Sequence, residues 1–389
     1  MEKADVLVIG GGIAGASCAL FLSEAGLDVT LLERGALAGE ASGVNAGMID
    51  APGEAEVPDL DITLKMGSRE IFRSLQVDRG HDIGFRESGE LVLLANEAEL
   101  EWAESLPLPS GMDLIDRRTV RSIEPNLTDN VMGALHIPGG SCAEPADATL
   151  AAAVEAGRAG ARVVDHTEVT AIERSAGGVT VTTAAGRYGA DALVIAAGAW
   201  SAEVGRMLGF VLPIQPVRGQ MWATEPLPPR LFNTVAGAES ASHWTSSPPT
   251  EPPDVTHMGG ARVTRHLYGR QRSNGEVIFG GDRVPGSDRR VDQEAIESNH
   301  AHAAELLPFL RDAPPARVWS GLMPFTSDGR PLIGAIPDQS GTYVVGGLAS
   351  SGFSRGPMAG RLLADLMTGV PTPSELSAAD PAARVTPSP

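Results

Sequence analysis

A glycine-rich turn near the N-terminus constrains the fold of this chain more than any other feature. Residues 10–15 fit the pattern G-x-G-x-x-G, directly after a short apolar run and before an Ala- and Leu-rich stretch with helical spacing. In such a turn Gly10 permits the tight bend, Gly12 admits a pyrophosphate against the backbone, and Gly15 lets the helix pack on the strand. A second apolar run at 27–32 completes a strand–helix–strand unit, which indicates a parallel sheet.

An acidic residue follows this unit where a dinucleotide would need it. Glu33 lies at the end of the second apolar run, 18 residues after Gly15. A carboxylate there can accept hydrogen bonds from ribose hydroxyls, although an ordinary surface glutamate would satisfy the sequence too. Because a carboxylate repels a 2'-phosphate, NADP is disfavoured, and FAD and NAD remain as candidates.

Composition excludes several other classes of protein. The chain has 389 residues, 42% of them hydrophobic, and a formal net charge of -19, which suits two globular domains and argues against nucleic-acid and anionic-membrane partners. Its cysteines, Cys18 and Cys142, have no paired spacing, so we expect neither a disulfide framework nor a metal site. With no apolar run of about 18 residues and no signal-like N-terminus, we expect no membrane span and a cytoplasmic location.

The order of patterns along the chain predicts one domain inserted into another. We expect an α/β fold in which a Rossmann-like dinucleotide-binding domain surrounds an α+β substrate domain built on an antiparallel or mixed sheet. A Pro-rich stretch at 246–253 is either a surface loop or a lid, and the Pro- and Ser-rich C-terminal tail is expected to fray. The predicted boundaries are 1–85, 140–212 and 320–369 for the first domain, 86–139 and 213–319 for the second, and 370–389 for the tail.

Four further segments carry a family resemblance. They are a small-residue loop at 40–48, a strand running into a glycine turn at 191–200, and the segments 328–334 and 346–353. With these segments the chain resembles the D-amino acid oxidase, sarcosine oxidase and glycine oxidase superfamily of FAD enzymes, over residues 5–367. The resemblance implies that the first domain is a Rossmann-like FAD-binding domain.

The resemblance also implies which residues bind the cofactor. They lie in the N-terminal turn, after the second strand, in the small-residue loop, and in three later turns. FAD is expected to be noncovalent, because the sarcosine oxidases attach flavin to a cysteine near the position of Met323. The implied FAD-binding residues are Gly10, Gly12, Ile13, Ala14, Gly15, Glu33, Arg34, Ala41, Ser42, Asn45, Ala46, Gly47, Met48, Val169, Ala197, Gly198, Trp200, Gly347, Leu348, Ala349, Ser350, Ser351, Gly352, Phe353 and Ser354.

Two arginines typical of the family are missing here. Amino acid oxidases of this type hold the substrate carboxylate with arginines at positions that are Met323 and Ser350 in this chain. A buried carboxylate without a cation would be costly, so another arginine is needed for such a substrate. Arg218, Arg270 and Arg355 are the candidates, and for each the alternative is an ordinary salt bridge.

The predicted reaction is FAD-dependent oxidation of a C–N bond in a small amine, secondary amine or amino acid, by hydride transfer to flavin N5 to give an imine. One alternative is a partner-dependent subunit similar to proline or opine dehydrogenases, or a tailoring flavoenzyme; another is an NAD-linked dehydrogenase. Oxygen, a quinone or an electron-transfer protein would reoxidise the flavin, and homo- or hetero-oligomers are both open. Candidates for the substrate pocket are Trp222, Tyr268, Met323, Phe353 and Arg355.

Overall fold

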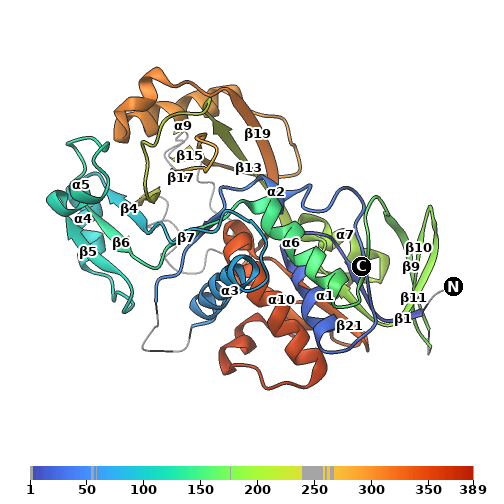
Figure 1. Ribbon diagram of the computed structural model, residues 1–389. Coiled ribbons are helices and arrows are strands. Elements are labelled where there is room, and N and C mark those ends of the chain that lie inside the picture. The colour runs from blue at the N-terminus through green and yellow to red at the C-terminus, as the bar shows by residue number, and fades with distance from the viewer. Residues whose placement is uncertain are drawn as a thin grey trace.

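The chain forms two large sheets that lie one above the other (Figure 1). The computed structural model describes residues 3–53, 57, 59–175, 177–238, 257–258, 261–262 and 267–388. The Pro-rich stretch at 246–253 lies outside these residues, so its predicted role as a loop or lid stays a prediction.

The first sheet is the parallel sheet that the N-terminal unit predicts. Its path runs β20-β21-β11-β1-β2-β8; the pairs from β21 to β8 are parallel, and only β20 is antiparallel. An antiparallel hairpin, β9 and β10, extends it from β11. The strands are β1 (Lys3–Ile9), β2 (Val29–Leu32), β8 (Arg162–Val164), β9 (Val169–Ser175), β10 (Gly178–Thr183), β11 (Gly186–Ile195), β20 (Leu332–Ala335) and β21 (Thr342–Gly346).

Both faces of this sheet are covered, which explains its continuous apolar strands. Val6 and Val8 of β1 point into a core shared with helices α1 and α10, whereas Leu7 and Ile9 point to the opposite face and pack with the β9–β10 hairpin. Helices α3 and α6 pack beside α10 and α1 and complete the helical layer. These helices are α1 (Ile13–Glu24), α3 (Leu60–Val77), α6 (Pro145–Arg158) and α10 (Gly352–Thr368).

The second sheet is mixed, as predicted for the inserted domain. Its order is β19-β13-β18-β17-β14-β4-β6-β5, antiparallel except for the parallel β14–β4 pair. Helix α9 (Gln293–Leu306) covers its outer face (Figure 1). The strands are β4 (Glu90–Leu94), β5 (Asp113–Asp116), β6 (Gly133–Ile137), β13 (Ile214–Ala223), β14 (Thr234–Gly237), β17 (Tyr268–Gln271), β18 (Val277–Pro285) and β19 (Arg317–Thr326).

Strand β19 crosses one of the predicted boundaries. It runs from residue 317 to residue 326 and pairs with β13 along its whole length, so the chain returns to the first sheet only after residue 326 rather than at residue 320. Several short helices and strands lie outside the two large sheets. They are α2 (Ala41–Val44), β3 (Met48–Ile49), α4 (Glu97–Glu104), α5 (Arg117–Ile123), β7 (Ser141–Cys142), α7 (Ser201–Met207), β15 (His257–Met258) and β16 (Ala261–Arg262).

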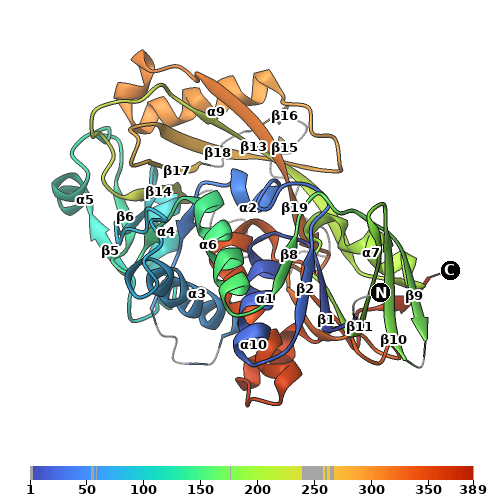
Figure 2. The same ribbon diagram turned by 45° about the vertical axis from the view of Figure 1, so that its right-hand side comes forward.

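The C-terminal tail is ordered, so the expectation that it frays is wrong. Its strand β22 (Thr386–Pro387) pairs with β12 (Phe210–Val211), and Leu376 is buried. Arg384 donates to Asp328 and to the carbonyl of Pro331, and these bonds fasten the tail to the first sheet. The first and last described residues lie on the same side of the molecule (Figure 2). Along the described ranges, no helix is both long and apolar enough to cross a bilayer.

Candidate active site

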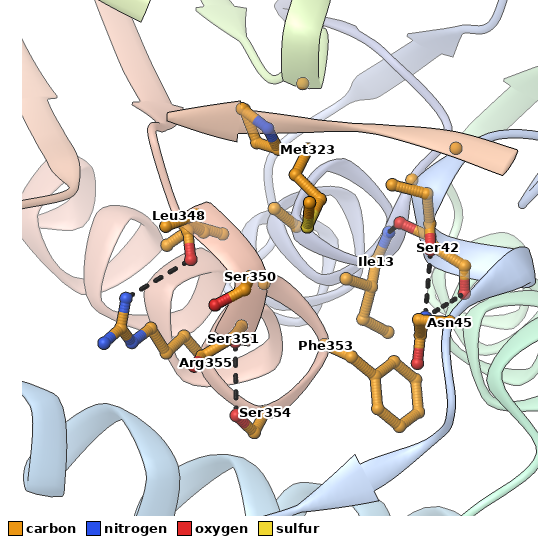
Figure 3. A pocket seen from close by; sticks show the side chains of 18 of the residues that line it. Ile13, Ser42, Asn45, Met323, Leu348, Ser350, Ser351, Phe353, Ser354 and Arg355 are labelled. Atoms are coloured by element: carbon orange, nitrogen blue, oxygen red, sulfur yellow. Dashed lines mark hydrogen bonds between the residues drawn. The ribbon is translucent and has the colours of Figure 1, made fainter. Parts of the chain in front are cut away.

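A cavity of about 800 Å³ lies between the helical layer of the first sheet and the inner face of the second. It is long and takes its lining from segments spread along the sequence, from residue 9 to residue 355. Figure 3 shows one end of the cavity, where the Met323 side chain points from β19 toward the turn that contains Leu348 and Ser350. A cavity of this size suits a cofactor and a small substrate together.

The glycine turn has the geometry that its sequence predicts. Gly10 has a φ of +117°, and a Cβ atom on it would stand 2.4 Å from the carbonyl oxygen of Ala196. A Cβ on Gly15 would stand 2.0 Å from the carbonyl oxygen of Gly10, so the helix packs against the turn only because residue 15 is glycine. The N-terminal end of α1 therefore opens into the cavity, and its peptide dipoles favour an anion there.

Glu33 lines the same end of the cavity and holds the turn in shape. Its Oε2 atom accepts a hydrogen bond from the amide of Gly11 at 2.6 Å, and its Oε1 atom accepts one from the amide of Gly35 at 2.8 Å. Each carboxylate oxygen has a further lone pair, so the group can still accept from ribose hydroxyls. The structure thus adds a structural role to the predicted one.

A planar stack lies beside Glu33. The guanidinium of Arg34 sits 3.8 Å from the ring centroid of Trp200 and also donates to Glu40 at 3.0 Å. Both residues line the cavity, together with Val169 and Gly198. This end of the cavity offers flat surfaces and backbone groups, which suits an adenosine.

The small-residue loop is fixed by its own side chains. Ser42 Oγ accepts from the amide of Ile13 at 2.9 Å, which ties the loop to the start of α1 (Figure 3). The Asn45 side chain donates to the carbonyls of Ala41 and Ser42 and accepts from the amide of Gly47. The loop therefore enters the cavity as a rigid wall.

The last glycine turn forms the opposite wall. Arg355 donates to the carbonyl of Leu348 at 3.3 Å, and Ser354 donates to the carbonyl of Ser351 at 3.2 Å (Figure 3). The ring of Phe353 packs on Phe72, with centroids 4.6 Å apart. Of the residues implied to bind FAD, all line the cavity except Gly15 and Gly347. These two glycines belong to turns whose other residues line it.

One face of the second sheet forms the roof of the inner cavity. The register places residues from seven neighbouring strands on that face. Since side chains alternate between the two faces of a sheet, the residues between them point to the outer core. The roof consists of Leu135 and Ile137, Glu90 and Val92, Ala236, Tyr268, Arg283, Gly219 and Met221, and Trp319, Gly321 and Met323.

Four of the five predicted pocket residues line the cavity, and the alternation of side chains places the fifth on the other face of the sheet. Tyr268, Met323, Phe353 and Arg355 line the cavity. Trp222, expected to be an apolar wall, lies instead in the outer core, fully buried against Phe279 and His300, with its indole nitrogen donating to Asn299. Its neighbour in sequence, Met221, occupies the roof, because adjacent residues of a strand face opposite sides.

Two of the arginine candidates are engaged elsewhere. Arg270 is 1% exposed and donates to the carbonyls of Ala46 and Ala143 and to Glu144, so it fastens the small-residue loop. Arg218 donates to Asp282 and to a backbone carbonyl. Neither lines the cavity.

The residue patterns did not single out Arg283, which does line the cavity. It lies in β18 opposite Gly219 of β13, is 7% exposed, and neighbours Tyr268. Burial lowers the pKa of Arg283 to about 10, although the charge of Tyr268 raises it. Burial also disfavours ionisation of the Tyr268 hydroxyl and raises its pKa. No sequence pattern pointed to it, because simple alternation from Phe279 would place residue 283 on the outer face, and the register shift opposite Gln220 and Met221 turns Arg283 to the roof instead.

Charged residues from α3 and its neighbours lie at one side of the cavity. Lys65 contacts Asp50 and Asp61, and Arg355 contacts Asp61. Burial opposes ionisation of both Asp61 and Lys65, but neighbouring charges outweigh this effect. Lys65 and Arg355 bring the pKa of Asp61 well below its usual range, and Asp50 and Asp61 raise the pKa of Lys65. These residues stay charged at neutral pH. Glu90 faces them from the roof.

Residues 5–366 match the FAD dependent oxidoreductase family, and the chain belongs to that family. Glycine oxidase of Geobacillus kaustophilus (strain HTA426) is 28% identical over 378 residues, which cover 94% of this chain and 93% of that relative. The crystal structure of glycine oxidase from Geobacillus kaustophilus matches with a TM-score of 0.82 at 28% identity and covers 98% of each chain. Iminodiacetate oxidase from Chelativorans sp. BNC1 matches with a TM-score of 0.78 at 25% identity, covering 97% of this chain and 99% of that one. The predicted family, fold class and FAD dependence are confirmed.

Proposed function

We propose that this protein oxidises the C–N bond of a small amino acid or secondary amino acid with FAD as its cofactor. The observation that carries the proposal is that Arg283 and Tyr268 neighbour each other in the roof of the cavity that the turn of Leu348 and Ser350 also lines. A cation and a hydroxyl beside apolar side chains of the roof suit the carboxylate of such a substrate. The relatives named glycine oxidase and iminodiacetate oxidase support this substrate class.

The residues that line the cavity fit FAD. The glycine turn and the start of α1 would hold the pyrophosphate, Glu33 and Arg34 would hold the ribose and adenine, and the 348–354 turn would hold the flavin. FAD supplies a two-electron acceptor that lets an amine lose a hydride and become an imine, which water then hydrolyses. Both cysteines are fully buried and neither lines the cavity, which supports noncovalent binding. The residues implied to bind FAD belong to the predicted FAD-binding domain, and the roof residues belong to the predicted substrate domain except Gly321 and Met323, which lie just past its boundary at residue 319.

The chain's own groups would orient the substrate. Arg283 takes over the anion-binding role that family members give to the positions of Met323 and Ser350. The Met323 methyl fills the space over Gly219, since a Cβ there would lie 3.0 Å from it, and this keeps the roof beside Arg283 apolar. An apolar surface excludes water and favours the neutral amine, whose lone pair the oxidation needs.

The visible spectrum of the purified protein tests this proposal. Amino acids, imino acids and simple amines are added anaerobically in turn, and bleaching of the flavin band identifies the class oxidised. Admitting air then separates an oxidase from an enzyme that needs a quinone or an electron-transfer partner. A flavin band that none of these compounds bleaches would contradict the proposed function and favour a partner-dependent subunit.

A further inference from the structure

Four of the charged residues at the side of the cavity balance one another. Lys65 and Arg355 supply two positive charges, and Asp50 and Asp61, which they contact, supply two negative charges. Every one of these four lines the cavity. Glu90, which feels the charges of Asp50 and Lys65, is a fifth ionisable group without a matching cation in this set.

Glu90 is held in unusual surroundings for a carboxyl group. It is 6% exposed, it lines the cavity, and its Oε2 atom has no hydrogen-bond partner among the described residues. Val92, Leu135 and Ile137 flank it on the roof. Burial first and Asp50 second raise the pKa of Glu90 to about 8, while Lys65 lowers it. A buried carboxyl group with an unsatisfied oxygen costs free energy of folding, which indicates that a ligand group in the cavity forms the missing interaction.

We propose that Glu90 binds a second, positively charged group of the substrate, such as the distal ammonium or guanidinium of a basic amino acid. This inference rests on the proposed function, in which Arg283 holds the carboxylate. A cation would complete the charge balance of the cluster, and the apolar neighbours of Glu90 would strengthen the ion pair. A neutral substrate would leave Glu90 protonated and without a partner.

Matched ligand pairs test the charge directly. Dissociation constants of the flavin-loaded protein are measured from the perturbed flavin spectrum for ornithine against norvaline and lysine against norleucine, in both enantiomers. The members of each pair differ chiefly in the distal ammonium. We expect the wild-type protein to prefer the cationic member at least about tenfold, which corresponds to an ion pair of roughly 1.4 kcal/mol.

The Glu90→Gln variant separates charge from hydrogen bonding. Glutamine keeps the shape and can donate, but it cannot balance a cation, so we expect the preference to shrink to within about twofold while the affinity for norleucine is unchanged. Glu124→Gln is the matched control, because Glu124 is also a buried glutamate with a raised pKa but does not line the cavity. Flavin content and melting temperature show whether each variant is folded.

Proton release gives a second readout. Binding of a distal cation at pH 7 should ionise Glu90, so calorimetry in two buffers of different ionisation enthalpy should find up to one more proton released with lysine than with norleucine. Equal affinities, no binding by either member, or a preference that survives in Glu90→Gln would overturn the inference. Failure of the proposed function differs from these outcomes, because binding would then occur without bleaching by any amino compound.

Discussion

Replacement of Arg283 by methionine tests the proposed anion site. Methionine keeps an unbranched apolar stem but removes the charged guanidinium. Because Arg283 is 7% exposed, its bond to a carboxylate would form largely out of water. A charge-assisted hydrogen bond contributes about 1.5–3 kcal/mol, so Arg283→Met should weaken binding of an amino acid about 10- to 150-fold.

The assay compares each amino acid with the amine that lacks only its carboxyl group. Dissociation constants come from the flavin spectrum, and reduction rates from anaerobic stopped flow. We expect Arg283→Met to bind the amine as the wild type does, so that the two ligands differ in their response to the mutation. Arg118→Met, which changes an exposed arginine outside the cavity, is the control for loss of a positive charge.

Stability distinguishes a binding role from a structural one. Burial lowers the pKa of Arg283, which means that the folded protein bears a cost for desolvating the charge. The melting temperature of Arg283→Met should therefore be no lower than that of the wild type. Equal losses for the amino acid and the amine, together with a lower melting temperature, would refute the assignment of Arg283 to the carboxylate.

Three further changes have defined outcomes. Ser42→Ala removes the acceptor of the Ile13 amide, and fluorescence titration of the apoprotein should show FAD affinity reduced by about 1 kcal/mol, or roughly fivefold. Burial raises the pKa of Glu124 from its ordinary 4.5 to about 7 in the folded state, so between these pH values the folded state holds a proton that the unfolded state has lost. The free energy of unfolding should therefore fall as the pH rises from 4.5 to 7, and urea titrations should show a shallower fall in Glu124→Gln. Deletion of 374–388 removes buried Leu376 and the bonds of Arg384, so the melting temperature should drop by several degrees, and an unchanged value would mean that the tail adds nothing.

The cofactor half of the cavity could be predicted from the sequence because its requirements are local. Gly10 and Gly15 are fixed by clashes within a few ångströms, and Glu33 by its position at the end of a strand. Such constraints leave a recognisable order of residues. Nearly every residue assigned to FAD from the sequence consequently lines the cavity.

The substrate half depends on pairing between distant strands. Whether Met221 or Trp222 faces the roof is decided by how β13 lies between β18 and β19, and a shift of one residue would exchange them. Arg283 reaches the roof through the same register, opposite Gly219. Glu90 looks from sequence like the first residue of an apolar strand, and only its neighbours in space show that it lines a cavity.

The order of the segments also affects when the protein can acquire its cofactor. The turn at residues 10–15 is synthesised first, but β11 pairs with β21, and the far wall of the cavity comes from the 348–354 turn near the end of the chain. During synthesis β11 therefore stays unpaired on one edge until β21 has been made, and such long-range pairing slows folding and exposes the chain to aggregation. FAD can bind the complete site only after the 348–354 turn has been made, and bound FAD then stabilises the folded state by mass action.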